Sequence, residues 1–322
     1  VLSIVLFISV SSFGFTQKDT LTSEMLLTNM RVQFECSEAI DSLYNGNFLV
    51  AEKQFGWIQE KYPNHPLGDF LMALSQRWKI MPNTEEEKYD ELFYRYLDQT
   101  IEKAKNLYKT DKKNPEATFF LAAAYGFKSQ RLAENGRIMA AIGPAEKASD
   151  YITENIDEVE MFGPEFLLGI GLYNYFREWI PHNKAYLKPV IMTFRKGDSQ
   201  LGMEQLNEVA NLSFYSRIEA LVYLIDIYSQ YGFYTYDKKE WKEGKRSWKK
   251  NKEDKAKDTY ISKGKAKGNR QYNYSRAYDI SKNLYNTYSN NRYFEQLYAE
   301  LSVLSGRNTI GGIEVMRKCL VR

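Results

Sequence analysis

The chain has 322 residues, 43% of them hydrophobic and 26% charged, with a formal net charge of +3. A chain of this length and apolar content can bury a substantial core, which excludes a wholly disordered protein. Two histidines and two cysteines leave too little material for a zinc cage or a disulfide framework, so we expect no metal and no cofactor.

Residues 1–10 read VLSIVLFISV, an apolar run that is too short to span a bilayer. Small residues follow at Ser12 and Gly14, before the charged Lys18. This order is typical of a secretory signal peptide, so we predict a signal peptide, truncated at its start, over residues 1–16. The mature chain is then exported and lies in the periplasm, at the outer envelope or outside the cell, with no transmembrane span. The alternative is that this run forms the first helix or strand of the fold.

From Glu24 onward, apolar residues recur at spacings of three and four, whereas strict alternation is scarce. One such series is Leu92, Tyr96, Ile101, Ala104, Leu107 and Tyr108. This period places apolar residues on one face of an α-helix, so we predict an all-α protein.

Turn-forming residues separate the predicted helices. Breaks are expected at Asn114–Pro115, Gly163–Pro164 and Asn290–Asn291. Thr84 and Glu87 have the spacing of a capping box, and acids favour the positive end of a helix dipole. A helix is therefore predicted to begin in the acidic run 85–87.

The segment from Tyr44 to Pro63 joins a small residue, Ala51, to an aromatic residue four positions later, Phe55. The small residue lets two helices approach closely, the ring fills the groove beside it, and the proline ends the second helix. This pattern resembles the second half of a tetratricopeptide repeat. Looser copies have their small residues at Ala104, Ala148, Gly202, Ala277 and Gly312.

The resemblance implies an all-α fold, a right-handed α-solenoid of degenerate helix-turn-helix repeats over residues 17–235. Residues 271–322 would form C-terminal helices of the same solenoid. Because the small residues recur at irregular steps, an irregular helical bundle is the alternative. In a solenoid, Cys36 and Cys319 would lie at opposite ends, so we expect each to be a buried apolar residue rather than half of a disulfide.

Residues 236–270 depart from the repeat pattern and are predicted to be a basic, low-complexity insertion. Between Lys238 and Arg270 the sequence has fourteen basic and five acidic residues, with Trp241 and Trp248 among them. Such a segment is typical of a solvated loop. The alternative is that it binds an anionic surface, such as lipid headgroups or acidic polysaccharide. We expect no nucleic acid as partner because the chain is predicted to be exported.

No arrangement of residues typical of a catalytic site is found in the sequence. His65 and His182 lie in predicted turns without a partner at ligand spacing, so we interpret both as surface residues. Phosphate-binding loops, nucleophile elbows and paired-cysteine metal motifs do not occur. Two carboxylates on a groove wall could hydrolyse a glycoside, which leaves an α-helical glycoside hydrolase as the less favoured alternative. We therefore predict that the protein is not an enzyme.

The resemblance implies that the first helix of each pair lines a concave groove. With Ala73 and Gly169 as packing residues, the groove candidates are Phe70, Arg77, Trp78, Phe166, Tyr173, Asn174 and Arg177. Family members that clamp a peptide's terminal carboxylate use Lys and Asn at these positions, whereas this chain has Phe70, Leu74, Phe166 and Ile170 there. The predicted function is a protein–protein interaction scaffold or adaptor of the cell envelope that binds a partner segment in this groove. A glycan- or small-ligand-binding helical module is the alternative.

Overall fold

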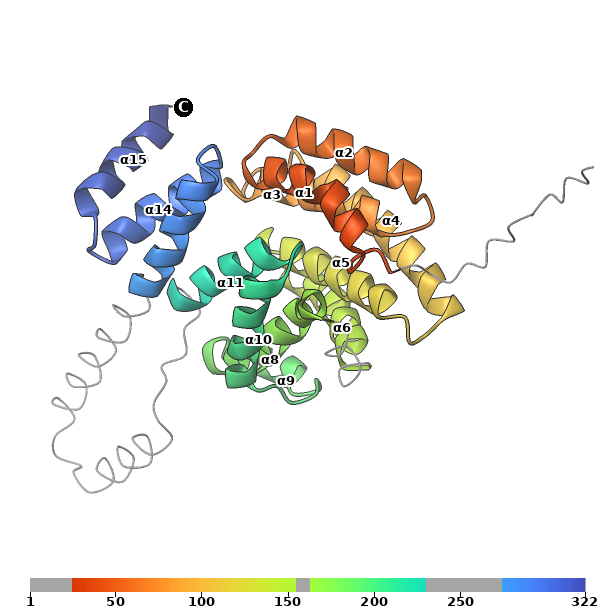
Figure 1. Cartoon of the computed structure of the whole chain (residues 1–322). Helices are drawn as coiled ribbons and strands as arrows, with labels where there is room; N and C mark the ends of the chain where they lie inside the picture. Colours follow the sequence, from red (N-terminus) through yellow and green to blue (C-terminus); the bar gives the residue numbers. More distant parts are fainter. Residues whose placement is uncertain (1–24, 155–162, 230–273, 322) are drawn as a thin grey trace, which may run out of the picture.

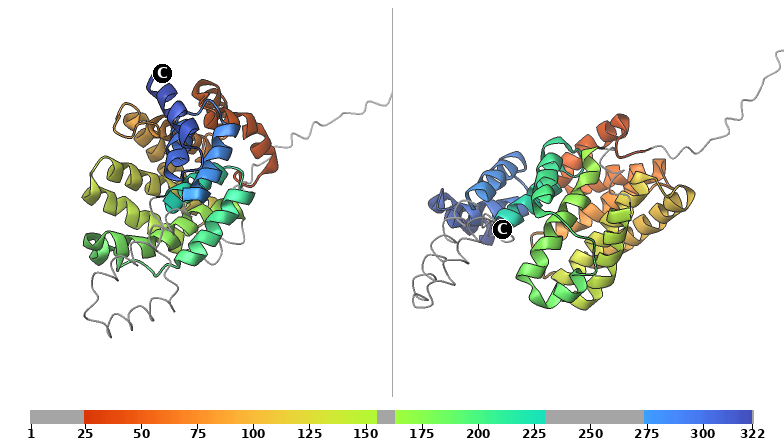
Figure 2. Two further views of the ribbon diagram at one scale, coloured as in Figure 1. Left: turned by 90° about the vertical axis from the view of Figure 1, so that its left-hand side faces the viewer. Right: turned by 90° about the horizontal axis from the view of Figure 1, so that it is seen from below.

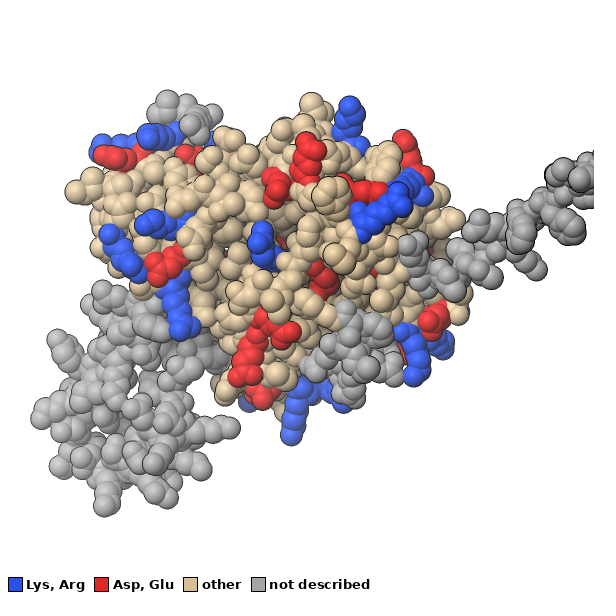
Figure 3. Space-filling model, in the orientation of Figure 1, with Lys and Arg blue, Asp and Glu red and all other residues tan. Residues whose placement is uncertain are grey.

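The computed structural model describes residues 25–154, 163–229 and 274–321, and every regular element in these ranges is a helix (Figure 1). The predicted all-α class is therefore confirmed. The predicted signal peptide, residues 1–16, and the predicted basic insertion, residues 236–270, lie outside the described residues. On the face shown in Figure 3, acidic and basic side chains of the described residues are interspersed. None of the described helices is long and apolar enough to cross a membrane.

The regular elements of the described ranges run in the following chain order. They are α1 (Met30–Tyr44), α2 (Phe48–Lys61), α3 (Leu67–Ile80), α4 (Asp90–Thr110), α5 (Pro115–Glu134), α6 (Ile138–Glu154), α8 (Leu167–Asn183), α9 (Lys188–Ile191), α10 (Ser199–Leu212), α11 (Arg217–Ser229), α14 (Arg292–Leu304) and α15 (Thr309–Val321). Two short 3-10 helices are η2 (Pro164–Phe166) and η3 (Ala185–Leu187), and residues 274–287 are also helical.

Two of the predicted breaks are helix starts with side-chain caps. The Asn114 side chain accepts a hydrogen bond from the Ala117 amide at 2.9 Å, and Pro115 is the first residue of α5. Asn291 caps α14 by accepting from the Tyr293 amide at 2.9 Å. These caps satisfy backbone N–H groups that have no partner inside the helix, which is why the local sequence predicts them.

The helix predicted to begin at residues 85–87 begins instead at Asp90, so this prediction is wrong. Arg131 of α5 is the physical reason. Its guanidinium donates to the carbonyls of Thr84 at 2.8 Å and Glu86 at 3.1 Å, and its Nε donates to the Asp90 carboxylate at 2.7 Å. A buried guanidinium needs several acceptors, and the loop supplies them only in a non-helical conformation.

Consecutive helices pack against each other from α1 to α6, and again from α8 through α10 to α11 (Figure 2). Small residues lie at the close approaches: Ala51 is fully buried, and a Cβ atom on Gly68 would lie 2.8 Å from the Gln59 amide nitrogen of α2. At the α8–α10 contact, a Cβ on Gly202 would lie 2.7 Å from the Gly171 carbonyl oxygen. Gly171 is therefore the close-packing glycine of α8, and the assignment of that role to Gly169 is wrong.

The C-terminal helices return to the N-terminal ones. The Asn291 side-chain amide donates to the Tyr44 carbonyl at 2.8 Å, and the Tyr44 and Tyr288 rings lie 5.9 Å apart. The Trp78 ring at the end of α3 lies 5.2 Å from Phe294 of α14. Part of the surface that was predicted to be an open groove is therefore covered by helices from the other end of the chain.

Of the two cysteines, Cys36 is buried as predicted, whereas Cys319 on α15 is only partly buried. Burial raises the pKa of the Cys36 thiol to about 11. The Cys36 side chain is therefore neutral and belongs to the apolar core.

Candidate functional site

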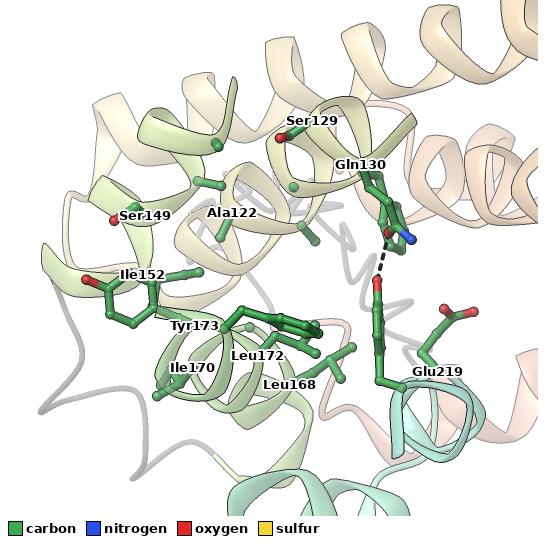
Figure 4. A pocket seen from close by; sticks show the side chains of 18 of the residues that line it. Ala122, Ser129, Gln130, Ser149, Ile152, Leu168, Ile170, Leu172, Tyr173 and Glu219 are labelled. Carbon is green, nitrogen blue, oxygen red and sulfur yellow. Dashed lines mark hydrogen bonds between the residues drawn. The ribbon is translucent and has the colours of Figure 1, made fainter. Parts of the chain in front are cut away.

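A cavity of about 620 Å³ lies among α3, α5, α6, α8 and α11 (Figure 4). Each helix contributes residues at spacings of three and four, which are the residues of one helical face. Most of the wall is aliphatic or aromatic. The apolar wall includes Leu67, Phe70 and Leu74 from α3, Phe119, Ala122 and Phe127 from α5, Ile152 from α6, and Ile170, Phe176 and Ile180 from α8.

The space exists because α5 presents small residues where its neighbours present large ones. Ala122, Ala123, Gly126 and Ala133 follow each other along the cavity face of α5. A Cβ atom added to Gly126 would meet no atom within 4 Å. The short side chains of α5 therefore leave a volume that the rings of α3 and α8 do not fill.

One end of the cavity is polar and carries acids from α11. Glu219, Tyr223 and Asp226 line it at spacings of four and three. The Tyr223 hydroxyl donates to the Gln130 side-chain oxygen at 2.8 Å, shown as the dashed line in Figure 4, and Glu219 lies on the same side. The Glu219 carboxylate accepts from Trp78 Nε1 at 2.7 Å.

Arg77 is the cation nearest to these acids. Its Nε lies 3.7 Å from a Glu219 oxygen and its Nη1 lies 4.0 Å from a Glu134 oxygen, and the guanidinium sits 4.9 Å from the Phe127 ring centroid. The side chain is only 4% exposed, and among the described residues its Nε has no hydrogen-bond partner. Arg77 therefore holds the acids by charge attraction without the short hydrogen bonds of an ideal buried pair.

Burial changes the protonation of the acids on α11. Burial raises the pKa of Asp226 to about 7, because the attraction of Arg77 only partly compensates and Glu134 adds repulsion. Burial also raises the pKa of Glu219, against the opposing effects of Arg77 and the Trp78 hydrogen bond. Near neutral pH the Asp226 carboxyl is therefore divided between its charged and neutral forms.

The opposite side of the cavity, where Tyr173 lies in Figure 4, is closed by residues that follow α9. The Tyr173 hydroxyl donates to the Arg195 carbonyl at 2.7 Å. Arg177 donates to the Phe194 carbonyl at 3.0 Å through Nη2 and at 3.4 Å through Nε. Since Phe194 itself lines the cavity, Tyr173 and Arg177 hold part of the wall in place.

Four of the seven predicted groove residues line this cavity: Phe70, Phe166, Tyr173 and Arg177. The other three do not: Arg77 and Trp78 are buried beside Glu219, and Asn174 packs against α10. There the Asn174 amide donates to Gln205 of α10 at 2.9 Å. Residues of α3 and α8, the two helices predicted to line the groove, thus line this cavity together with residues of α5, α6 and α11.

Sequence reasoning missed the contributions of α5 and α11. The acids of α11 could have been noticed in the sequence, because Glu219 and Asp226 are seven residues apart, on one face of the mostly apolar helix RIEALVYLIDIYS. Acids in such a helix need a specific environment. The small residues of α5 did not indicate a cavity, because alanine and glycine are also typical of positions where two helices pack closely.

Buried carboxylates also position the helices that form the cavity. Glu165 of η2 accepts hydrogen bonds from the amides of Phe214, Tyr215 at 2.9 Å and Ser216 at 3.1 Å, just before α11 begins. Glu116 of α5 lies 2.9 Å from His65 Nε2. The interpretation of His65 as a surface residue is therefore wrong, because only 11% of its side chain is exposed.

Among the described residues, no group of three or more His, Cys, Asp and Glu side chains is placed to hold a metal ion. A comparison of the chain with protein-family models, curated proteins and solved structures found no match. The function is therefore inferred from the cavity and from the acids at its polar end.

Proposed function

We propose that this protein is a non-enzymatic binding module that takes an apolar molecule into the cavity among α3, α5, α8 and α11. The observation that carries the proposal is the cavity itself, about 620 Å³ of space between α3, α5, α6, α8 and α11. Protein interiors are close-packed, with few voids larger than a water molecule. Ligand pockets typically have volumes of about 300–1,000 Å³ and apolar walls with a few polar groups, which this cavity matches.

The composition of the wall favours an apolar ligand over a glycan. Sugar rings present many hydroxyl groups, and these need hydrogen-bond partners along the whole ligand. Here most of the lining residues are aliphatic or aromatic, Leu74, Phe127 and Ile170 among them. The same wall argues against glycoside hydrolysis, although Glu219 and Asp226 place two carboxylates in one cavity.

We also propose that the helices are degenerate tetratricopeptide-like repeats of a right-handed solenoid. Support comes from the packing of each helix on the next and from the small residues at the close approaches, Ala51, Gly68 and Gly202. Export of the mature chain rests on the apolar run at residues 1–10 alone, and it stays a prediction.

A scaffold function is the second candidate, and the outer surface of α1 and α2 favours it. Met30, Phe34 and Leu49 are each more than four-fifths exposed there. A partner protein could bury these side chains without entering the cavity. Replacing Phe34 and Leu49 by Ser should then abolish binding of the partner protein while leaving the cavity intact. A partner that binds the variant as well as wild type would contradict a role for this surface in binding.

The cavity proposal is tested by filling the space with one side chain. Gly126→Phe places a ring where a Cβ meets no atom within 4 Å, and Gly126→Ala is the matched control that adds one methyl group. Binding of the neutral apolar dye Nile red is followed by fluorescence, and circular dichroism verifies that both variants remain helical. We expect binding to wild type and Gly126→Ala, and loss of binding to Gly126→Phe. Equal binding to all three proteins would contradict the proposal.

A further inference from the structure

Among the described residues, acids outnumber cations around the polar end of the cavity. Four carboxylates, those of Asp90, Glu134, Glu219 and Asp226, share the guanidinium groups of Arg77 and Arg131. Arg131 forms ion pairs with Asp90, at 2.7 Å from its Nε, and with Glu134, at 3.5 Å from its Nη1. Of the cations in the described ranges, Arg77 therefore remains to face both Glu219 and Asp226.

Of these four acids, Asp226 is the one whose negative charge is least compensated by neighbouring cations and hydrogen-bond donors in the described residues. Among the described residues, none forms a hydrogen bond or an ion pair with its carboxylate. The charged groups that act on it are Arg77 of α3, Glu134 of α5 and Glu300 of α14, while Tyr223 and Tyr293 lie nearby. One cation therefore opposes two further acids around a carboxyl group that lines the cavity.

The opposite side of the cavity is less suited to hold a charged group. Arg177 already donates to the Phe194 carbonyl through two nitrogens. Lys184 also lines the cavity, but its side chain is exposed, so solvent screens its charge. An anion there would compete with an existing contact, whereas a cation at the α11 end would meet Asp226, which has no ion pair among the described residues.

We infer that the cavity selects an amphiphile with a cationic head, an alkylammonium ion whose ammonium lies beside Asp226 and Glu219 and whose apolar body lies against α3, α5 and α8. This inference rests on the proposed function, because it names the class of molecule that the cavity takes. The ammonium supplies hydrogen-bond donors and a positive charge to Asp226, which has neither an ion pair nor a hydrogen bond among the described residues, and it adds a second cation beside Glu219. The wall around Phe70, Phe127 and Phe176 removes the chain from water.

The test uses three probes that share one twelve-carbon tail: dodecylammonium, dodecanol and dodecanoate. Binding to the full chain is measured by titration calorimetry at neutral pH, below the concentrations at which the probes aggregate. We expect dodecylammonium to bind about tenfold or more tightly than dodecanol, and dodecanoate to bind most weakly. If dodecylammonium binds no more tightly than dodecanol, or if dodecanoate binds best, the head-group inference is overturned and the cavity proposal stands. If no probe binds, both are overturned.

A variant locates the head group. Asp226→Asn should lower the affinity for dodecylammonium to that for dodecanol and leave dodecanol binding unchanged. The control Asp98→Asn removes the same charge from the exposed surface of α4 and should change neither affinity. In wild type, binding of dodecylammonium should also strengthen between pH 6 and pH 8 as Asp226 ionises, and this dependence should be absent from Asp226→Asn. Selectivity for the ammonium that survives in Asp226→Asn would overturn the assignment.

Discussion

The two faces of α8 are packed in opposite ways. On the α10 side, Gly171 and Gly202 bring the backbones so close that neither has room for a Cβ atom without displacing a neighbour. On the cavity side, Ile170 and Phe176 face a volume of about 620 Å³. Loose packing is therefore not a general property of this fold. The space is confined to one face, where α5 contributes alanine and glycine.

The tight face should be the more sensitive of the two. In Gly202→Val, the new Cβ would lie 2.7 Å from both the Gly171 carbonyl oxygen and the Tyr175 amide nitrogen, and backbone atoms cannot rotate away. We expect a loss of about 3 kcal/mol or more in the free energy of unfolding, measured by urea titration, because α8 and α10 must separate. A loss below about 1 kcal/mol would show that the two helices do not meet at these glycines.

The contact between α1 and α2 offers a second tight site. Ala51 is fully buried, as expected for the small residue of the repeat-like segment. Ala51→Leu should reduce the free energy of unfolding by about 1–3 kcal/mol through overpacking. The exposed neighbour Lys53 offers a control, since Lys53→Leu on the same helix should change stability by less than about 0.5 kcal/mol. Equal effects at the two positions would rule out the proposed repeat register.

The sequence predicted the tight contacts better than the cavity, for a physical reason. Helix period, caps and small residues act within about one or two turns of the chain, so the starts of α5 and α14 and the buried position of Ala51 could be inferred locally. The start of α4 could not, because Arg131 decides it from 41 residues away.

The short range of these local patterns also explains why some residues were assigned to a groove that they do not line. The helical period of the sequence placed Phe70, Phe166, Tyr173 and Arg177 on one surface, and all four line the cavity. It could not show that Trp78 is covered, because Glu219 lies 141 residues further along the chain. Whether a helix face meets solvent, a cavity or another helix depends on segments that local patterns do not relate to each other.

The acidic end of the cavity should make stability depend on pH. The pKa of Asp226 is raised from 3.8 to about 7 in the folded protein, so the folded state holds this proton more tightly than the unfolded state does. The stability associated with protonated Asp226 is therefore fully present below about pH 4, and it is lost as the pH rises to about 7. Asp226→Asn should remove this dependence.

The effect is measured as the difference between the two proteins. Each unit of pKa change corresponds to about 1.4 kcal/mol, and solvent in the cavity reduces that value. We expect Asp226→Asn to gain about 1–2 kcal/mol over wild type between pH 4 and pH 7.5, from urea unfolding at each pH. Asp98→Asn, on the exposed surface of α4, should follow the wild-type curve. Parallel curves for wild type and Asp226→Asn would contradict the burial of this carboxyl.

The smallest effect is expected on the loose face, and its sign is opposite. Gly126→Ala adds a methyl group that meets no atom within 4 Å, in the interior of α5. Alanine favours the helix over glycine by about 0.5–1 kcal/mol, so the variant should be more stable than wild type by that amount. Gly202→Ala makes the same chemical change on the tight face and should destabilise the protein. If both substitutions stabilise, or both destabilise, the contrast between the two faces is wrong, because the helix preference is the same and only the surrounding space differs.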